Sequence, residues 1–260
     1  MMEELICSRM DGIVTLTISR PEEKNMLSDE VIALFCDRMS TLDQDHSVRV
    51  VVLKGEGREF FCGGIFNPLQ MAQLSPDQIR LRRRRANDLF DGLEKLTHPV
   101  IAAINGRAQA GGFELALACD MRVAVTHATF CMPENTWGMF PGAGGPLRLP
   151  RLVGTGKAME IIMTGRAVEA REALSIGLVE RVVSSDEFET EVRRLAERIA
   201  ASGPLGNRAV KKLVRASAEM SMQARRDYSD ALREPLASSV DTTEGTAAYR
   251  EGRPPRFQGR

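Results

Sequence analysis

The sequence lacks the features that direct a chain to a membrane or to nucleic acid. It has no run of about 18 apolar residues, the length that a membrane-spanning helix needs. Lys plus Arg and Asp plus Glu both number 35, so the formal net charge is zero and does not favour nucleic acid or an anionic membrane as a partner. Residues 1–5 are acidic and are not expected to form a secretory signal. We therefore expect a cytoplasmic protein.

Cysteine and histidine are too scattered to indicate a metal centre. The five cysteines are an odd number without C-x-x-C spacing, which predicts neither a disulfide framework nor a zinc site. His46, His98 and His127 each lie next to a polar loop or a strand edge, so we expect structural or exposed roles for them rather than catalysis. Walker, G-x-S-x-G and H-E-x-x-H motifs are all missing. No metal is therefore expected, and the familiar nucleotide, serine-hydrolase and zinc-protease sites are not indicated.

The sequence does contain an alternation of apolar strands and helical patterns. Residues 12–19 alternate and are β-branched, which predicts a strand, and three apolar runs predict further strands at residues 48–53, 100–104 and 121–125. A helix is predicted from Ser28, with apolar residues at helical spacing as far as Leu42. Strands that alternate with helices favour an α/β fold with right-handed crossovers.

The pattern changes after about Gly154 and becomes mainly helical. One strand is predicted at residues 178–183. The predicted helices cover residues 157–163, 170–175, 187–201, 205–217 and 223–232. The helices after Pro204 have too narrow an apolar stripe for an interior position, so we expect them to pack on the core or on a neighbouring subunit. The chain is thus predicted to have an α/β core, residues 1–200, and a helical C-terminal region, residues 201–260.

Two glutamates lie in apolar, glycine-rich surroundings. Glu114 follows Gly111-Gly112-Phe113 and Glu134 follows Pro133, so both carboxyl groups are expected to be buried and tuned for acid–base chemistry. Glycines at strand ends let the backbone approach a ligand and could supply two convergent N–H donors. Taken singly, Glu114 could cap its helix, Glu134 could be an ordinary loop acid, and the glycines could be turn residues.

Four consecutive arginines, residues 82–85, lie on a predicted helix. We expect a solvated helix face there, with a contact to phosphate or nucleic acid as the alternative. Trp137 and Phe140 are expected to belong to the core or to a pocket wall.

In order along the chain, these segments resemble the enoyl-CoA hydratase/isomerase (crotonase) family. The resemblance spans residues 12–257. Its motifs are Arg20-Pro21 with Lys24-Asn25, residues 99–106, Gly111-Gly112-Phe113-Glu114, Pro133-Glu134, Pro141 to Gly145 with Arg148-Leu149, residues 163–166, 173–179 and Glu244-Gly245 with Arg253 and Phe257.

The resemblance implies a spiral of ββα turns whose C-terminal helices mediate trimers, often paired into hexamers. It implies a substrate that is a coenzyme A thioester, with no cofactor beyond the coenzyme A that the substrate carries. The thioester oxygen would be held by the backbone amides of Ile65 and Gly111, and the coenzyme would lie against Lys24, Gly63 and Gly64. Glu114 and Glu134 match the two catalytic acids of family hydratases.

Several residues depart from the family pattern. Gly64-Ile65-Phe66 stands where members commonly read Gly-Ala-Asp, so a carboxylate often found there is replaced by Phe66. Ala110 replaces a frequent glycine, and Trp137 places a bulky ring soon after Glu134. These departures predict a reshaped acyl pocket more than a different chemistry.

The leading functional hypothesis is reversible addition of water across the double bond of a 2-enoyl-CoA thioester. Isomerisation of the acyl double bond, or another dehydratase or lyase reaction on an acyl-CoA, is the alternative on the same scaffold. A non-catalytic scaffold of this family is the alternative of another class. Such a scaffold is expected to lose a catalytic acid or an oxyanion glycine, whereas this chain keeps Glu114, Glu134 and Gly111.

Overall fold

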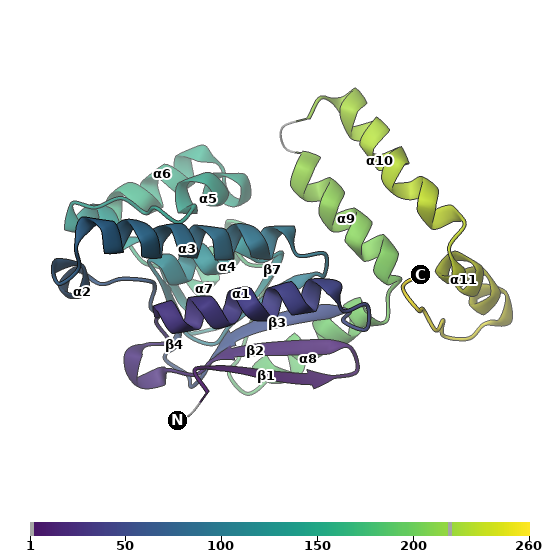
Figure 1. Cartoon of the computed structure of the whole chain (residues 1–260), viewed down its shortest axis with the longest axis horizontal. Helices are drawn as coiled ribbons and strands as arrows, with labels where there is room; N and C mark the ends of the chain where they lie inside the picture. Colours follow the sequence, from purple (N-terminus) through teal and green to yellow (C-terminus); the bar gives the residue numbers. More distant parts are fainter. Residues whose placement is uncertain (1–2, 218–219) are drawn as a thin grey trace.

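The computed structural model describes residues 3–217 and 220–260, and its larger sheet has six strands in the order β1-β2-β3-β5-β7-β10 (Figure 1). These strands are β1 (Leu5–Met10), β2 (Ile13–Ile18), β3 (Val50–Gly55), β5 (Val100–Ile104), β7 (Met121–Val125) and β10 (Arg181–Val183). β1 and β2 are antiparallel, and the other neighbouring strands are parallel. All five residues of β5 are buried, as expected of a parallel strand covered on both faces.

A smaller sheet has the order β4-β6-β8-β9. Its strands are β4 (Phe60–Cys62), β6 (Arg107–Gln109), β8 (Thr129–Cys131) and β9 (Val168–Glu169). The strands β4, β6 and β8 each follow a strand of the larger sheet and precede a helical segment. The chain therefore makes three successive ββα turns, which bring the segments after β4, β6 and β8 to one region.

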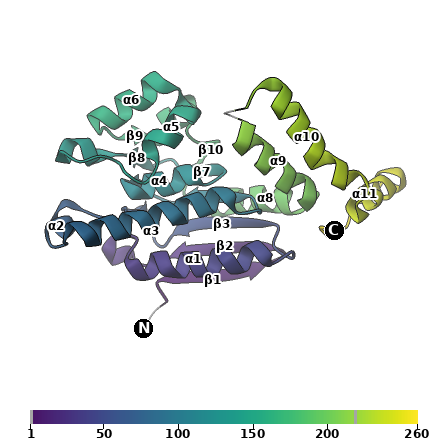
Figure 2. The same cartoon turned by 45° about the horizontal axis from the view of Figure 1, so that its top comes forward.

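Helices cover both faces of the larger sheet. Before residue 201 they are η1 (Pro21–Glu23), α1 (Asp29–Gln44), α2 (Pro68–Ala72), α3 (Pro76–Lys95), α4 (Gly111–Ala118), η2 (Pro133–Trp137), α5 (Gly145–Val153), α6 (Thr155–Thr164), α7 (Ala170–Ser175) and α8 (Phe188–Ala200). α1 begins where the Ser28 hydroxyl accepts the Val31 N–H at 3.1 Å, and it buries Val31, Phe35 and Met39. α1 and α3 lie side by side in both views, whereas α8 packs on β2, β3 and β7 (Figures 1 and 2).

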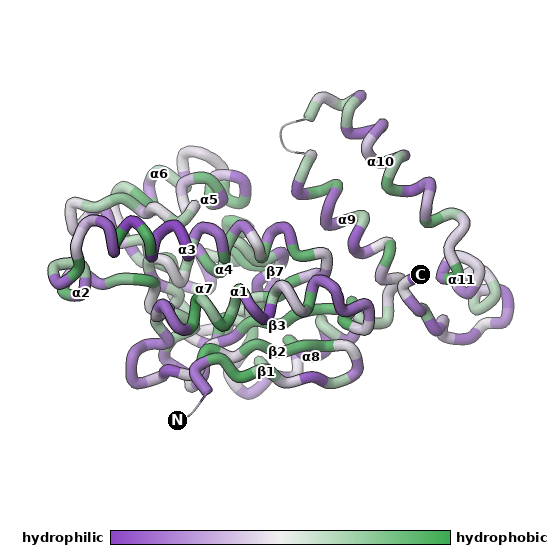
Figure 3. Tube along the Cα trace, in the orientation of Figure 1, coloured by the Kyte–Doolittle hydropathy of each residue, from purple (hydrophilic) through white to green (hydrophobic). Residues whose placement is uncertain are grey.

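Three C-terminal helices stand out from this body (Figures 1 and 2). They are α9 (Pro204–Ala216), α10 (Met222–Ala237) and α11 (Val240–Glu251). Hydrophobic residues concentrate along the strands of the body, while α9 and α10 alternate between hydrophobic and hydrophilic residues (Figure 3). Several apolar side chains of these helices are exposed, including Val210, Val214 and Tyr249.

Most predicted elements are present, although the strand predicted at residues 178–183 is limited to β10, Arg181–Val183. α10 continues five residues beyond the predicted end, to Ala237. No element was predicted over α5, whose Pro146 lies in the first turn, where no intrahelical N–H is needed. α11 was not predicted, because it buries only Asp241 and Ala248 and therefore has no apolar stripe. It begins at Ser239, whose hydroxyl accepts the Thr242 N–H at 3.1 Å.

Within residues 3–217 and 220–260, no helix is long and apolar enough to cross a membrane. The same residues contain no group of three or more His, Cys, Asp or Glu side chains placed to hold a metal ion.

Candidate active site

The segments after β4, β6 and β8 surround a cavity of about 170 Å³. Ile65, Gly111, Glu114 and Glu134 all line it. The remaining wall is largely apolar and comes from α2, α3 and the segment after η2. The structure thus brings together four residues that come from three successive turns of the chain.

Glu114 lies in the first turn of α4 and is buried, with 2% of its surface exposed. Its Oε1 atom accepts the N–H groups of Ala143 and Gly145, at 2.9 and 2.8 Å. Burial raises the pKa of Glu114, while these two hydrogen bonds and the nearby Arg148 act in the opposite direction. The expectation of a buried, tuned carboxyl group is therefore met by the geometry, and the carboxyl group has donors that favour its ionised form.

Glu134 lies in η2 and is also buried, with 9% of its surface exposed. Its Oε2 atom has no hydrogen-bond partner in the described part of the chain. Burial raises the pKa of Glu134 to about 7, and the charge of Glu114 raises it further, against a hydrogen bond from its own backbone. Burial thus raises the pKa of both carboxyl groups, but Glu114 accepts two N–H groups that favour its carboxylate, whereas the Oε2 of Glu134 has no partner in the described residues.

The amide nitrogens of Ile65 and Gly111 lie close together. A Cβ atom added to Gly111 would lie 3.2 Å from the Ile65 nitrogen and 2.7 Å from the Ile65 Cγ1 and Cδ1 atoms. A Cβ atom on Gly64, whose φ is +110°, would lie 3.2 Å from the Gly111 nitrogen. In the described residues neither the Ile65 nor the Gly111 N–H donates a hydrogen bond. Only glycines allow these two loops to approach so closely.

A second cavity, of about 390 Å³, shares Phe66 and Trp137 with the first. Lys24 and Gly63 line this second cavity. Gly64 does not line either cavity and is buried beneath them, where its carbonyl oxygen accepts the Leu27 N–H at 2.8 Å. Two of the three residues expected to contact the coenzyme, Lys24 and Gly63, thus line this second cavity.

Trp137 and Phe140 line the first cavity, as expected of a pocket wall. Phe66 lies between the two cavities, and the Arg82 guanidinium carbon is 5.3 Å from the centre of its ring. The histidines do not line either cavity, and buried His98 contacts the Leu42 carbonyl oxygen at 2.9 Å.

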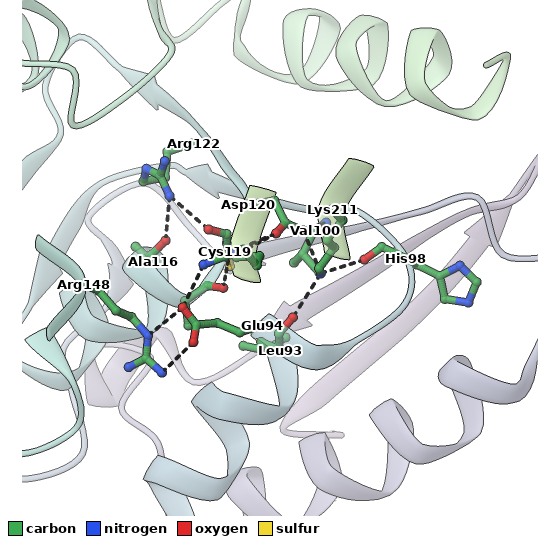
Figure 4. Close-up of polar contacts among 12 residues, drawn as sticks. Leu93, Glu94, His98, Val100, Ala116, Cys119, Asp120, Arg122, Arg148 and Lys211 are labelled. Carbon is green, nitrogen blue, oxygen red and sulfur yellow. Dashed lines mark hydrogen bonds and ion pairs between the residues drawn. The ribbon is translucent and has the colours of Figure 1, made fainter. Parts of the chain in front are cut away.

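Sequence reasoning did not find the residues that support the Glu114 donors. The Arg148 Nη1 donates to the Ala143 carbonyl oxygen at 2.9 Å, and its Nη2 pairs with Asp91 at 2.6 Å and with Glu94 at 3.3 Å. Figure 4 shows the contacts between Arg148 and Glu94. Arg148-Leu149 belonged to the resemblance, but neither composition nor spacing indicated a role for this arginine.

Glu94 also links this network to α9. Its Oε1 pairs with the Arg215 Nη1 at 2.7 Å. Buried Lys211, also on α9, donates to the Leu93 and His98 carbonyl oxygens and pairs with Asp120 at 2.8 Å (Figure 4). The first C-terminal helix is therefore fixed to the body close to the elements that carry the cavity.

The sequence matches a family model described as "Enoyl-CoA hydratase/isomerase" over residues 8–260. This match covers nearly the whole chain and agrees with a cavity that holds two buried glutamates between glycine-rich loops. The chain belongs to the enoyl-CoA hydratase/isomerase (crotonase) family.

Individual relatives support the same assignment. The chain is 35% identical to the 2,3-dehydroadipyl-CoA hydratase of Escherichia coli and 36% identical to the carnitinyl-CoA dehydratase of Salmonella arizonae, with 100% of each chain covered. Its structure matches the crystal structure of an enoyl-CoA hydratase from Bacillus anthracis with a TM-score of 0.97 and 33% identity, covering 99% of this chain and 100% of that one. The expected α/β crotonase-like fold is thereby confirmed.

Proposed function

We propose that this protein is a hydratase that adds water reversibly to the double bond of a 2-enoyl-CoA thioester. The observation that carries the proposal is the pair of buried glutamates in one cavity, beside two backbone amides that donate to no acceptor in the described part of the chain. The hydratase and dehydratase names of the relatives support the same reaction.

The amides of Ile65 and Gly111 form the proposed oxyanion hole. Addition of water at the β-carbon places negative charge on the thioester oxygen of an enolate. Fixed N–H donors stabilise that charge without reorganising during the reaction. Neither N–H group has a hydrogen-bond partner within the described residues, so both are available to bind the thioester oxygen.

Glu114 is the proposed base that activates the water, and Glu134 is the proposed acid that delivers a proton to the α-carbon. Glu114 accepts two backbone hydrogen bonds on one oxygen, which favours a carboxylate. Glu134 has a buried oxygen without a partner among residues 3–217 and 220–260 and a pKa of about 7, which favours a proton donor near neutral pH. In the dehydration direction the two roles reverse.

The second cavity is the proposed site for the coenzyme A part of the substrate, against Lys24 and Gly63. Gly64 contributes through the position of the Ile65 and Gly111 amides rather than by direct contact. The substrate brings its own coenzyme A, and the proposed chemistry needs neither a metal nor a further cofactor.

Isomerisation is the second candidate on this scaffold. A proton shuttle between two carbons needs one well-placed carboxyl group, whereas water addition needs a base for water and an acid for carbon. Two carboxyl groups in one cavity with unequal surroundings favour hydration.

The proposal is tested by mixing the protein with crotonyl-CoA and following the enoyl-thioester absorbance band. Loss of the band is expected, with 3-hydroxybutyryl-CoA as the product. Glu114→Gln and Glu134→Gln are each expected to lower turnover roughly 10²–10⁴-fold while crotonyl-CoA still binds. Near-normal turnover in either variant would remove that residue from the mechanism, and a wild-type protein that binds without turnover would favour the scaffold.

A further inference from the structure

One cation, Arg83, faces the cavity that contains the two glutamates. Arg83 lies one turn after Ile79 on α3, so the two share a helix face, and both line this cavity. The stem of Arg83 lies against Gly142. A Cβ atom at position 142 would lie 2.9 Å from the Arg83 Cδ atom, so a side chain there would displace the arginine.

Arg83 differs from its three arginine neighbours. Arg82 and Arg85 both contact Asp29, at 2.9 and 3.7 Å. Arg84 is exposed, as Arg83 is, but Arg84 does not line the cavity. Arg83 makes no hydrogen bond or ion pair within residues 3–217 and 220–260, and it is the only Lys, Arg or His side chain among the described residues that line the cavity.

The other walls of the cavity indicate which kind of ligand suits this cation. Ile79, Met71, Met139 and Phe140 offer apolar contacts that suit the methylene groups of an acyl chain. A hydrocarbon chain gains little from an adjacent guanidinium group. A carboxylate accepts two parallel, charge-assisted hydrogen bonds from the planar guanidinium group of an arginine.

We propose that Arg83 binds a carboxylate at the far end of the acyl chain. The preferred substrate is then a 2-enoyl-CoA whose acyl group is the monothioester of an unsaturated dicarboxylic acid. This inference rests on the proposed hydratase function and adds the chemical class of the acyl group. Arg83 acts as a specificity-determining residue, since it lies in the cavity without contacting either glutamate.

The test compares two thioesters with six acyl carbons, 2-hexenoyl-CoA and 5-carboxy-2-pentenoyl-CoA, which end in a methyl group and in a carboxylate. Wild-type kcat/KM is expected to be at least about tenfold higher for the carboxylate. Arg83→Gln is expected to lower this selectivity ratio on the order of 10–100-fold, the usual range for a hydrogen-bonded charge pair, and Arg83→Lys should lower it less. Arg84→Gln is the matched control and should leave the ratio unchanged.

Three results would overturn the inference. A wild-type preference for 2-hexenoyl-CoA is one. An Arg83→Gln variant with the same selectivity ratio as wild type is another. Equal losses of kcat/KM on both substrates would mean that Arg83 binds the coenzyme, which the two substrates share. If neither thioester nor crotonyl-CoA is hydrated, the proposed function fails. The inference about Arg83 is then decided by the dissociation constants of the two thioesters. Equal dissociation constants in wild type would overturn it.

Discussion

At the residue scale, the two glutamates differ in their surroundings more than in their depth. Glu114 accepts two backbone N–H groups and has Arg148 nearby, whereas Glu134 has an oxygen with no partner in the described residues and Glu114 as its charged neighbour. Two identical side chains can therefore hold different protonation states at the same pH. This difference makes the pH dependence of turnover a test of the two proposed roles.

The first prediction concerns that pH dependence. Glu134 has a pKa of about 7, above its usual value, so it is protonated below that pH and ionised above it. Hydration needs the protonated form, so its kcat/KM should fall as pH rises through about 7. Dehydration needs the same single proton on Glu114 instead of on Glu134, so its kcat/KM should also fall as pH rises through about 7. Initial rates in both directions from pH 5.5 to 8.5 check this, and a kcat/KM for hydration that does not fall above pH 7 would contradict the assignment.

The second prediction concerns stability. The folded-state pKa of Glu134, about 7, exceeds its unfolded value of 4.5, so the folded protein binds more protons between these values. The free energy of unfolding therefore falls as pH rises from 4.5 to 7 and stays lower above 7. Glu134→Gln removes this loss and should be more stable than wild type at pH 8, by on the order of 1–3 kcal/mol.

Thermal unfolding of Glu134→Gln at pH 5 and pH 8 measures the effect. The difference from wild type should be smaller at pH 5. Glu169→Gln, at an exposed position, serves as the control and should not show the pH-dependent gain. If Glu134→Gln is less stable than wild type at pH 8, the folded protein accommodates the ionised Glu134 carboxylate well, which would contradict the prediction.

At the scale of the elements, the approach of the β4–α2 segment to the start of α4 defines the proposed oxyanion hole. A Cβ atom on Gly112 would lie 2.0 Å from the Cys62 carbonyl oxygen, so no larger residue fits there without moving the backbone. At Gly111 the obstacle is the end of the Ile65 side chain, which can be removed while its backbone N–H is kept.

Gly111→Ala should therefore lower turnover by displacing Ile65, roughly 10²–10³-fold if one donor is lost. Gly111→Ala combined with Ile65→Ala should recover much of the activity, because the colliding Cγ1 and Cδ1 atoms are gone and both N–H groups remain. Turnover of crotonyl-CoA by the single and double variants, with folding checked by circular dichroism, measures this. A double variant no better than Gly111→Ala would show that the two amides do not act together.

The elements also show what the sequence could predict. The strands β3, β5 and β7 were found because continuous apolar runs mark strands that are buried on both faces. The two glutamates were found because carboxyl groups among apolar residues are unusual. Arg148 and Lys211 were not found, because their partners are far away in the sequence and an isolated basic residue carries no sign of them.

At the scale of the whole molecule, the C-terminal helices have more apolar surface than the rest of the chain covers. Val210, Val214 and Tyr249 are 61%, 65% and 91% exposed. Lys211 and Arg215 fix α9 to the body through Asp120 and Glu94, so these helices are attached yet incompletely packed. Exposed apolar surface of this kind favours association with another copy of the chain.

We therefore predict a homo-oligomer, a trimer or a hexamer as the family resemblance implies. Light scattering should give a mass of three or six times the 28.7 kDa of one chain. Removal of residues 201–260 is not a suitable control, because Lys211 occupies a buried position in the body. A stable monomer at working concentration would contradict this prediction.

The central claim, that two glutamates add water across an enoyl thioester, is tested most directly by isotope incorporation. Crotonyl-CoA is incubated with the protein in ²H₂O that contains H₂¹⁸O, and the product is analysed by mass spectrometry. The account predicts one ¹⁸O at the β-carbon and one deuterium at the α-carbon, with both lost in Glu114→Gln and Glu134→Gln. A product with a shifted double bond and no ¹⁸O would contradict it.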